Sequence, residues 1–110
     1  QTILNRKKEV PCGSPTINPI YQKTLEELAA YSKNHRKKLI VFSSPEYADR
    51  CKDDDVLLDN LMQNLGIKYY NMTDFFKRNN DLKNWKDETH LSHKGASQFT
   101  IAFRKKLGLP

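Results

Sequence analysis

The stretch Leu39-Ile40-Val41-Phe42 is an uninterrupted apolar run with β-branched residues at its centre. Continuous apolar runs of this length are typical of strands buried on both faces, as in parallel sheets, whereas half-buried strands alternate apolar and polar residues. We therefore expect a strand here that is covered on both faces. Ser43-Ser44-Pro45 follows directly and is expected to end it.

A helical pattern lies on each side of this strand. Before it, Asn18 can cap a helix and Pro19 fits the first helical position, and apolar residues then recur at helical spacing to about residue 34. After it, the acidic run at residues 53–55 favours a helix N-terminus, and Gly66 is a natural left-handed stop. The strand is thus expected to lie between two amphipathic helices.

Two further elements complete the expected order. Residues 67–70 predict a second, shorter strand, and residues 94–107 predict a final amphipathic helix. Alternating helices and strands indicate an α/β fold with a short parallel sheet and flanking helices. Two strands alone leave both sheet edges unpaired and bury little surface. We therefore expect residues 18–110 to be part of a larger layered domain, or to pair with another chain through a sheet edge, and residues 1–17 to be a loop or arm.

Composition narrows the classes of function. The chain has 110 residues, 37% of them hydrophobic, which is enough for one domain with a thin core. No apolar run is long enough to cross a bilayer and no signal peptide is visible, so no membrane partner is expected. The formal net charge is +6, but aromatic residues are not interleaved with the basic clusters as a nucleic-acid stacking platform requires. A nucleic-acid partner is therefore the least favoured of the functions that the charge allows.

The sequence predicts no metal site. Cys12 and Cys51 have no metal-binding spacing and form no Cys-x-x-Cys, and their spacing leaves free thiols and one disulfide both open. His90 and His93 form a His-x-x-His pair, but zinc usually needs a third protein ligand. The acidic residues 53–55 lack the glycine and the spacing of a calcium loop.

Residues 85–96, Trp-Lys-Asp-Glu-Thr-His-Leu-Ser-His-Lys-Gly-Ala, lead into the final helix and carry the candidate chemistry. A turn of three residues can fold the carboxylate of Asp87 back onto the imidazole of His90. Asp87 would then hold one ring nitrogen of His90, and the other ring nitrogen would face a cleft. A histidine that acts as a general base needs this arrangement. Ser92 is expected to cap the helix, and Gly95 to let it pack closely. In open α/β sheets, ligands bind outside the carboxyl ends of the strands, where this turn is expected to lie.

The pattern Asp-x-x-His-Leu-Ser-x-x-Gly-Ala at residues 87–96 resembles the last conserved block of the SGNH/GDSL hydrolases, a superfamily of serine esterases and acyl hydrolases. The resemblance implies a partial three-layer, flavodoxin-like fold, in which residues 39–47 look like the penultimate core strand and the loop after it. It also implies that His90 is the general base of a Ser-His-Asp triad, that Asp87 orients it, and that no cofactor takes part.

The sequence departs from that family at the nucleophile. The family's serine lies in a Gly-Asp-Ser block after its first strand, and no such block occurs here; the Gly and Asn of its oxyanion hole are not found either. Without those donors, the largest electrostatic term in acyl transfer is absent. Ser43 and Ser44 follow a strand, where a nucleophile could lie, but no Gly-x-Ser-x-Gly surrounds them, and a serine before proline is typical of a turn.

Three functions are compatible with these features. The first is the C-terminal half of an SGNH/GDSL-type ester hydrolase (an esterase, acyl hydrolase or carbohydrate deacetylase), inactive without its N-terminal half and acting on an ester-bearing substrate such as an acylated carbohydrate. Tyr47 and Trp85 would then line the substrate groove, with core packing as the equal alternative. The second is a non-catalytic α/β domain that forms a homo-oligomer through a sheet edge, and the third is a basic nucleic-acid-binding module. For a bacterial source, the periplasm or secretion is expected over the cytoplasm.

Overall fold

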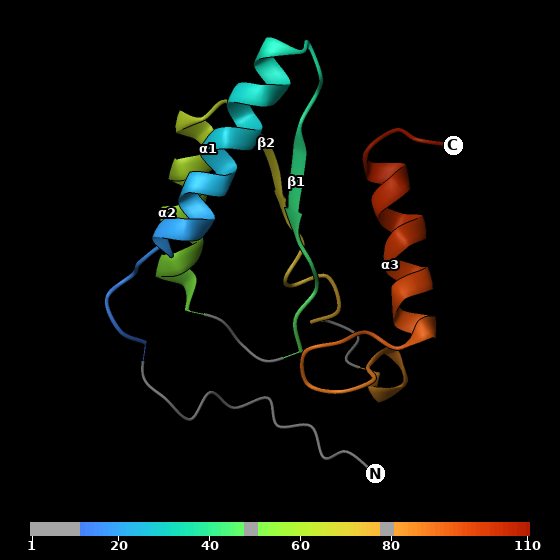
Figure 1. The fold of residues 1–110 in the computed structure, drawn as a ribbon. Coiled ribbons are helices and arrows are strands. Elements are labelled where there is room, and N and C mark those ends of the chain that lie inside the picture. Colours follow the sequence, from blue (N-terminus) through green and yellow to red (C-terminus); the bar gives the residue numbers. More distant parts are fainter. Residues whose placement is uncertain (1–11, 48–50, 78–80) are drawn as a thin grey trace. The chain divides into compact units, whose positions relative to one another are not determined.

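The computed structural model describes residues 12–47, 51–77 and 81–110 (Figure 1). These residues fall into two compact units. We call residues 12–43 and 51–71 the sheet unit, and residues 44–47, 72–77 and 81–110 the dyad unit. The expectation for residues 1–11 lies outside the described residues, and residues 12–18 form no helix or strand.

The described part of the chain is a mixed α/β structure with three α-helices and a short parallel sheet of two strands. In chain order, the elements are α1 (Pro19–Asn34), β1 (Ile40–Ser43), α2 (Lys52–Asn64), β2 (Lys68–Asn71), the 3-10 helix η1 (Leu82–Asn84) and α3 (His93–Lys106). The predicted alternation of helices and strands is confirmed. None of the helices in the described ranges is long and apolar enough to cross a membrane.

The helix ends follow the signals in the sequence. The side chain of Asn18 accepts a hydrogen bond from the backbone N–H of Ile20 over 2.8 Å, and Pro19 is the first residue of α1, where a missing N–H costs nothing. After α2, Gly66 has a φ of 70°, in the left-handed region that a residue without a side chain adopts most readily. Both predicted boundaries are therefore confirmed.

The core of the sheet unit lies between the sheet and its two long helices. Strand β1 pairs with β2 in parallel, and the register sets Val41 opposite Tyr69. Both of these residues pack against a buried cluster formed by Leu25 of α1, Met62 of α2 and Ile67. Figure 1 shows α1 and α2 on the same side of the sheet.

The expectation that β1 is buried on both faces is wrong for this structure. Phe42 is 44% exposed, and none of the four residues of β1 is fully buried. Side chains alternate along a strand, so Val41 faces the core while Phe42 and its register partner Tyr70 face the other way. Within the described sheet unit, both long helices contribute to the core on the Val41 face, and no second helix pair covers the Phe42 face.

A disulfide joins Cys12 to Cys51, with 5.8 Å between their Cα atoms. Cys51 is the residue before the first turn of α2, and Cys12 lies in the segment that precedes α1. The bond thus ties the start of the described chain to the start of α2. Of the two alternatives that the cysteine spacing left open, the structure contains the disulfide.

Candidate active site

A closed loop in the dyad unit presents Asp87 and His90. Trp85 and Leu91 form an isolated antiparallel bridge at the base of this loop. Within it, the backbone N–H of Lys86 donates to the carbonyl of His90 over 2.9 Å. The five residues between the bridge partners are therefore held in one tight turn. This turn brings the carboxylate of Asp87 and the imidazole of His90 onto the same side of the loop.

The first turn of α3 fixes the far end of this loop. The hydroxyl of Ser92 accepts a hydrogen bond from the backbone N–H of Gly95 over 3.1 Å and donates to the carbonyl of Lys83. The backbone N–H of Ser92 also donates to the carbonyl of Asn84 over 2.9 Å. Ser92 is thus the predicted N-cap of α3, and it also ties the helix to η1.

Gly95 lets α3 lie directly against η1. A Cβ added at Gly95 would collide with the backbone carbonyl of Asn84, because it would lie 2.9 Å from the carbonyl carbon and nearer still to the oxygen. Both residues are buried. The close packing expected of Gly95 is therefore present, and the group that it packs against is the backbone of Asn84.

Asp87 and His90 contact each other directly. Nδ1 of His90 lies 2.8 Å from Oδ1 of Asp87 and 3.0 Å from Oδ2. An ionised carboxylate only accepts hydrogen bonds, so this contact places the ring proton on Nδ1 and leaves Nε2 as the basic nitrogen. The side chain of His90 is 70% exposed. This is the orientation that a histidine needs in order to take a proton from a neighbouring hydroxyl.

The loop backbone also holds Asp87 in place. Its Oδ1 accepts hydrogen bonds from the backbone N–H groups of Thr89, over 2.9 Å, and His90, over 2.8 Å. The Thr89 N–H and then the His90 side chain lower the pKa of Asp87 from its ordinary 3.8 to about 2. Asp87 is therefore ionised at neutral pH, as a group that orients a histidine must be.

Thr89 belongs to this cluster and was missed by the sequence reasoning. Its hydroxyl donates to Oδ1 of Asp87 over 3.2 Å and lies 3.0 Å from Nδ1 of His90. In an Asx turn, an Asp side chain accepts a hydrogen bond from the backbone N–H two residues further on. Thr89 has this position relative to Asp87. That signal was available in the sequence, but the family pattern treats this position as variable.

Tyr47 and Trp85, the two candidates for a substrate groove, lie in an aromatic cluster. Their relative exposures are 5% and 6%, and their rings meet edge to face with 5.5 Å between centroids. Trp85 also contacts the ring of Phe76 edge to face. This burial supports the packing alternative for both residues. The indole Nε1 of Trp85 is buried and has no hydrogen-bond partner in the described structure.

No hydrogen bond or ion pair within the described residues joins Ser43, Ser44 or His93 to the Asp87–His90 pair. Ser43 is in the sheet unit and its hydroxyl forms a hydrogen bond with the hydroxyl of Tyr69, whereas Ser44 is an exposed residue of the dyad unit. His93 is the exposed first residue of α3. Across the described ranges, no three His, Cys, Asp or Glu side chains come together as a metal site would require.

In the described ranges, the geometry thus brings together an oriented histidine, His90, and an ionised carboxylate, Asp87. Comparisons with protein-family models, with curated proteins and with solved structures found no match to this chain.

Proposed function

We propose that this chain supplies the Asp and His of a Ser-His-Asp triad, and that it is the C-terminal part of an SGNH/GDSL-type ester hydrolase with a partial three-layer, flavodoxin-like fold. The observation that carries the proposal is the pair of contacts from Nδ1 of His90 to the two carboxylate oxygens of Asp87. A second support is the sequence that follows the pair. In it, Ser92 caps α3 and Gly95 lets α3 pack against the backbone of Asn84.

The proposed chemistry is acyl transfer from an ester. A serine hydroxyl from a segment outside this chain attacks the ester carbonyl while its proton moves to Nε2 of His90. The imidazolium then gives this proton to the departing alcohol, and a water molecule repeats the sequence on the acyl-serine. Asp87 stays ionised throughout and stabilises the imidazolium, in keeping with its lowered pKa.

The proposed substrate is an ester-bearing molecule such as an acylated carbohydrate. The dyad is exposed, so a substrate on the surface of a polymer could reach it. The Cys12–Cys51 disulfide supports a periplasmic or secreted location, since structural disulfides persist in oxidising compartments.

A fluorophosphonate tests this proposal on the whole gene product that contains the segment. An activated serine attacks its phosphorus, fluoride leaves, and the serine proton passes to the histidine base. We expect one labelled serine, located by peptide mass spectrometry outside residues 1–110. Labelling should be lost in His90→Ala and kept in His93→Ala, because His93 is an exposed histidine with no part in the dyad. A label on Ser43 or Ser44, or equal labelling of both variants, would contradict the proposal.

One observation favours a second function, a non-catalytic α/β domain that self-associates. The described sheet has only two strands, so each strand has one edge without a neighbour in that sheet. Sedimentation of the 110-residue chain separates the two functions. A concentration-dependent dimer would favour self-association, and a monomer at all concentrations would exclude it.

A further inference from the structure

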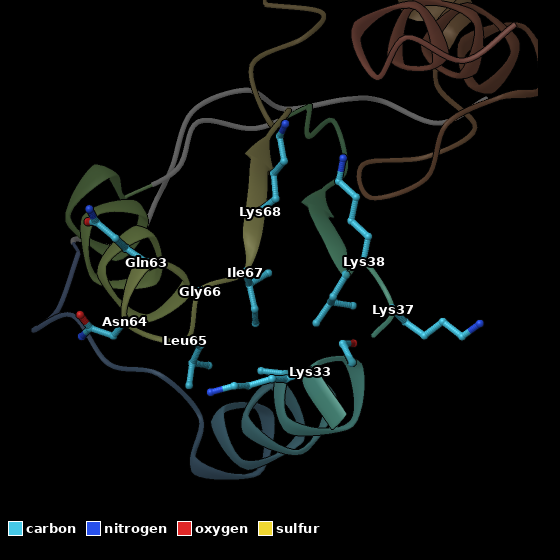
Figure 2. A pocket seen from close by; sticks show the side chains of 12 residues that line it. Lys33, Lys37, Lys38, Gln63, Asn64, Leu65, Gly66, Ile67 and Lys68 are labelled. Atoms are coloured by element: carbon cyan, nitrogen blue, oxygen red, sulfur yellow. The ribbon is translucent and has the colours of Figure 1, made fainter. Parts of the chain in front are cut away.

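Charged side chains do not converge in the hollow of the sheet unit. This hollow of about 610 Å³ opens where α1 and α2 end and β1 and β2 begin (Figure 2). Figure 2 shows Lys33 extending into it, whereas Lys38 and Lys68 extend from the two strands away from it. Because a small-molecule site needs a few convergent polar groups besides its apolar lining, we assign no ligand to this hollow. Polar groups converge instead in the dyad loop, around Nδ1 of His90.

The hydroxyl of Thr89 joins the two members of the dyad. It donates to Oδ1 of Asp87 over 3.2 Å, and its oxygen lies 3.0 Å from Nδ1 of His90. A hydroxyl has one proton and two lone pairs. Because the proton of Thr89 is given to Asp87, its oxygen faces Nδ1 of His90 with a lone pair and can only accept a hydrogen bond from that nitrogen.

Nδ1 of His90 therefore faces acceptors alone within the cluster. These are the two carboxylate oxygens of Asp87, at 2.8 and 3.0 Å, and the hydroxyl oxygen of Thr89. A proton on Nδ1 satisfies them, whereas the tautomer with its proton on Nε2 would set a nitrogen lone pair against oxygen lone pairs. The hydroxyl thus favours the same tautomer as the carboxylate does, and it does so from a second residue.

Two features hold this hydroxyl in position. The backbone N–H of Thr89 donates to Oδ1 of Asp87 over 2.9 Å, so the main chain of Thr89 is fixed relative to the carboxylate that its hydroxyl reaches. Threonine is also branched at Cβ, which restricts rotation about χ1. The hydroxyl is therefore placed against the imidazole before any substrate binds.

We propose that Thr89 is a positioning residue of the dyad, whose hydroxyl holds the His90 imidazole in the tautomer with its proton on Nδ1. Thr89 acts through His90 and leaves Nε2 free to take a proton. The catalytic consequence of this inference rests on the proposed function, whereas the effect on the tautomer is a property of the 110-residue chain itself.

NMR spectra that correlate the imidazole nitrogens with the ring protons of the neutral histidine test the inference on the 110-residue chain. Thr89→Val keeps the shape and the backbone N–H but removes the hydroxyl, and it should raise the ratio of the Nε2–H to the Nδ1–H form of His90 about threefold to tenfold. Thr89→Ser keeps the hydroxyl and should match the unchanged protein. Thr100→Val, at an exposed threonine of α3, is the matched control and should also match it.

Two outcomes of this measurement would overturn the inference. An unchanged ratio in Thr89→Val would show that the carboxylate of Asp87 alone sets the tautomer. A Thr89→Ser variant that behaves like Thr89→Val would show that the shape of the side chain matters and the hydroxyl does not.

Ester turnover by the gene product that contains this segment tests the catalytic consequence. Thr89→Val should lower kcat about threefold to tenfold and leave KM unchanged, because Thr89 acts on His90 and not on the substrate. A higher KM with an unchanged kcat would contradict a positioning role. If the unchanged gene product turns over no ester, the proposed function fails, and the tautomer ratio still decides the inference on Thr89.

Discussion

Nδ1 of His90 lies 2.8 Å from Oδ1 of Asp87, and the backbone N–H of His90 donates to the same carboxylate oxygen. The imidazole and the backbone N–H of His90 thus both hold the carboxylate of Asp87. The turn needs no residue from a distant element to bring the pair together. For this reason, the dyad was the part of the site that a sequence pattern could predict.

The first prediction concerns the ionisation of Asp87. The Thr89 N–H and the His90 side chain lower its pKa to about 2. A carboxyl with a folded-state pKa below its ordinary 3.8 contributes stability that is present above that value and is lost as the pH falls toward 2. Carboxyl carbon NMR titration should therefore give a midpoint near 2 for Asp87.

The variant His90→Ala should raise the pKa of Asp87 without restoring its ordinary value, because the Thr89 N–H remains. His93→Ala is the matched control and should leave the titration unchanged. An Asp87 midpoint that does not move in His90→Ala would show that the two side chains do not interact in solution.

The second prediction concerns the contact between α3 and η1. Gly95→Ala forces a methyl group against the backbone of Asn84, which cannot move aside as a flexible side chain would. We expect a loss of about 1–3 kcal/mol in the free energy of unfolding, typical of overpacking, although alanine is the better helix former. Fluorescence of Trp85, the only tryptophan, measures this during urea unfolding.

Gly13→Ala is the control for that substitution. Gly13 has no neighbouring atom within 4 Å of an added Cβ and is not among the glycines with positive φ. Its unfolding midpoint should match that of the unchanged protein. If Gly95→Ala also matches it, α3 does not pack against η1 as described.

The third prediction concerns the disulfide. The Cys12–Cys51 bond spans 39 positions in the sequence, so it restricts the unfolded chain strongly. The variant Cys12→Ser/Cys51→Ser should lose about 2–4 kcal/mol of unfolding free energy, measured by circular dichroism in urea. Reductant should destabilise the unchanged protein and have no effect on the variant. Two reactive thiols in the unfolded, unreduced protein would contradict the bond.

Sequence patterns predicted the order of elements well because each signal is local. Asn18-Pro19 begins a helix, Gly66 ends one, and Ser92 caps a third through contacts within a few residues. The exposure of Phe42 could not be predicted in the same way. An apolar run contains no polar residue to mark a solvent face, so its pattern does not indicate which face of the strand α1 and α2 cover.

Features that join distant residues were also outside the reach of sequence patterns. The pairing of Cys12 with Cys51 depends on where the chain folds back, and their spacing left two states open. Lys33 and Leu65 line one hollow only because the ends of α1 and α2 come together. The burial of Trp85 depends likewise on Tyr47 and Phe76, which precede it in separate segments.

Ester turnover by the gene product that contains this segment tests the central claim most directly. With 4-nitrophenyl acetate as substrate, we predict turnover that falls about a thousandfold or more in His90→Ala, because loss of a triad base typically costs that much, and that stays near the original value in His93→Ala. The 110-residue chain alone should show negligible turnover. Absence of turnover in the gene product, or a His90→Ala variant as active as His93→Ala, would contradict the claim that Asp87 and His90 are triad members.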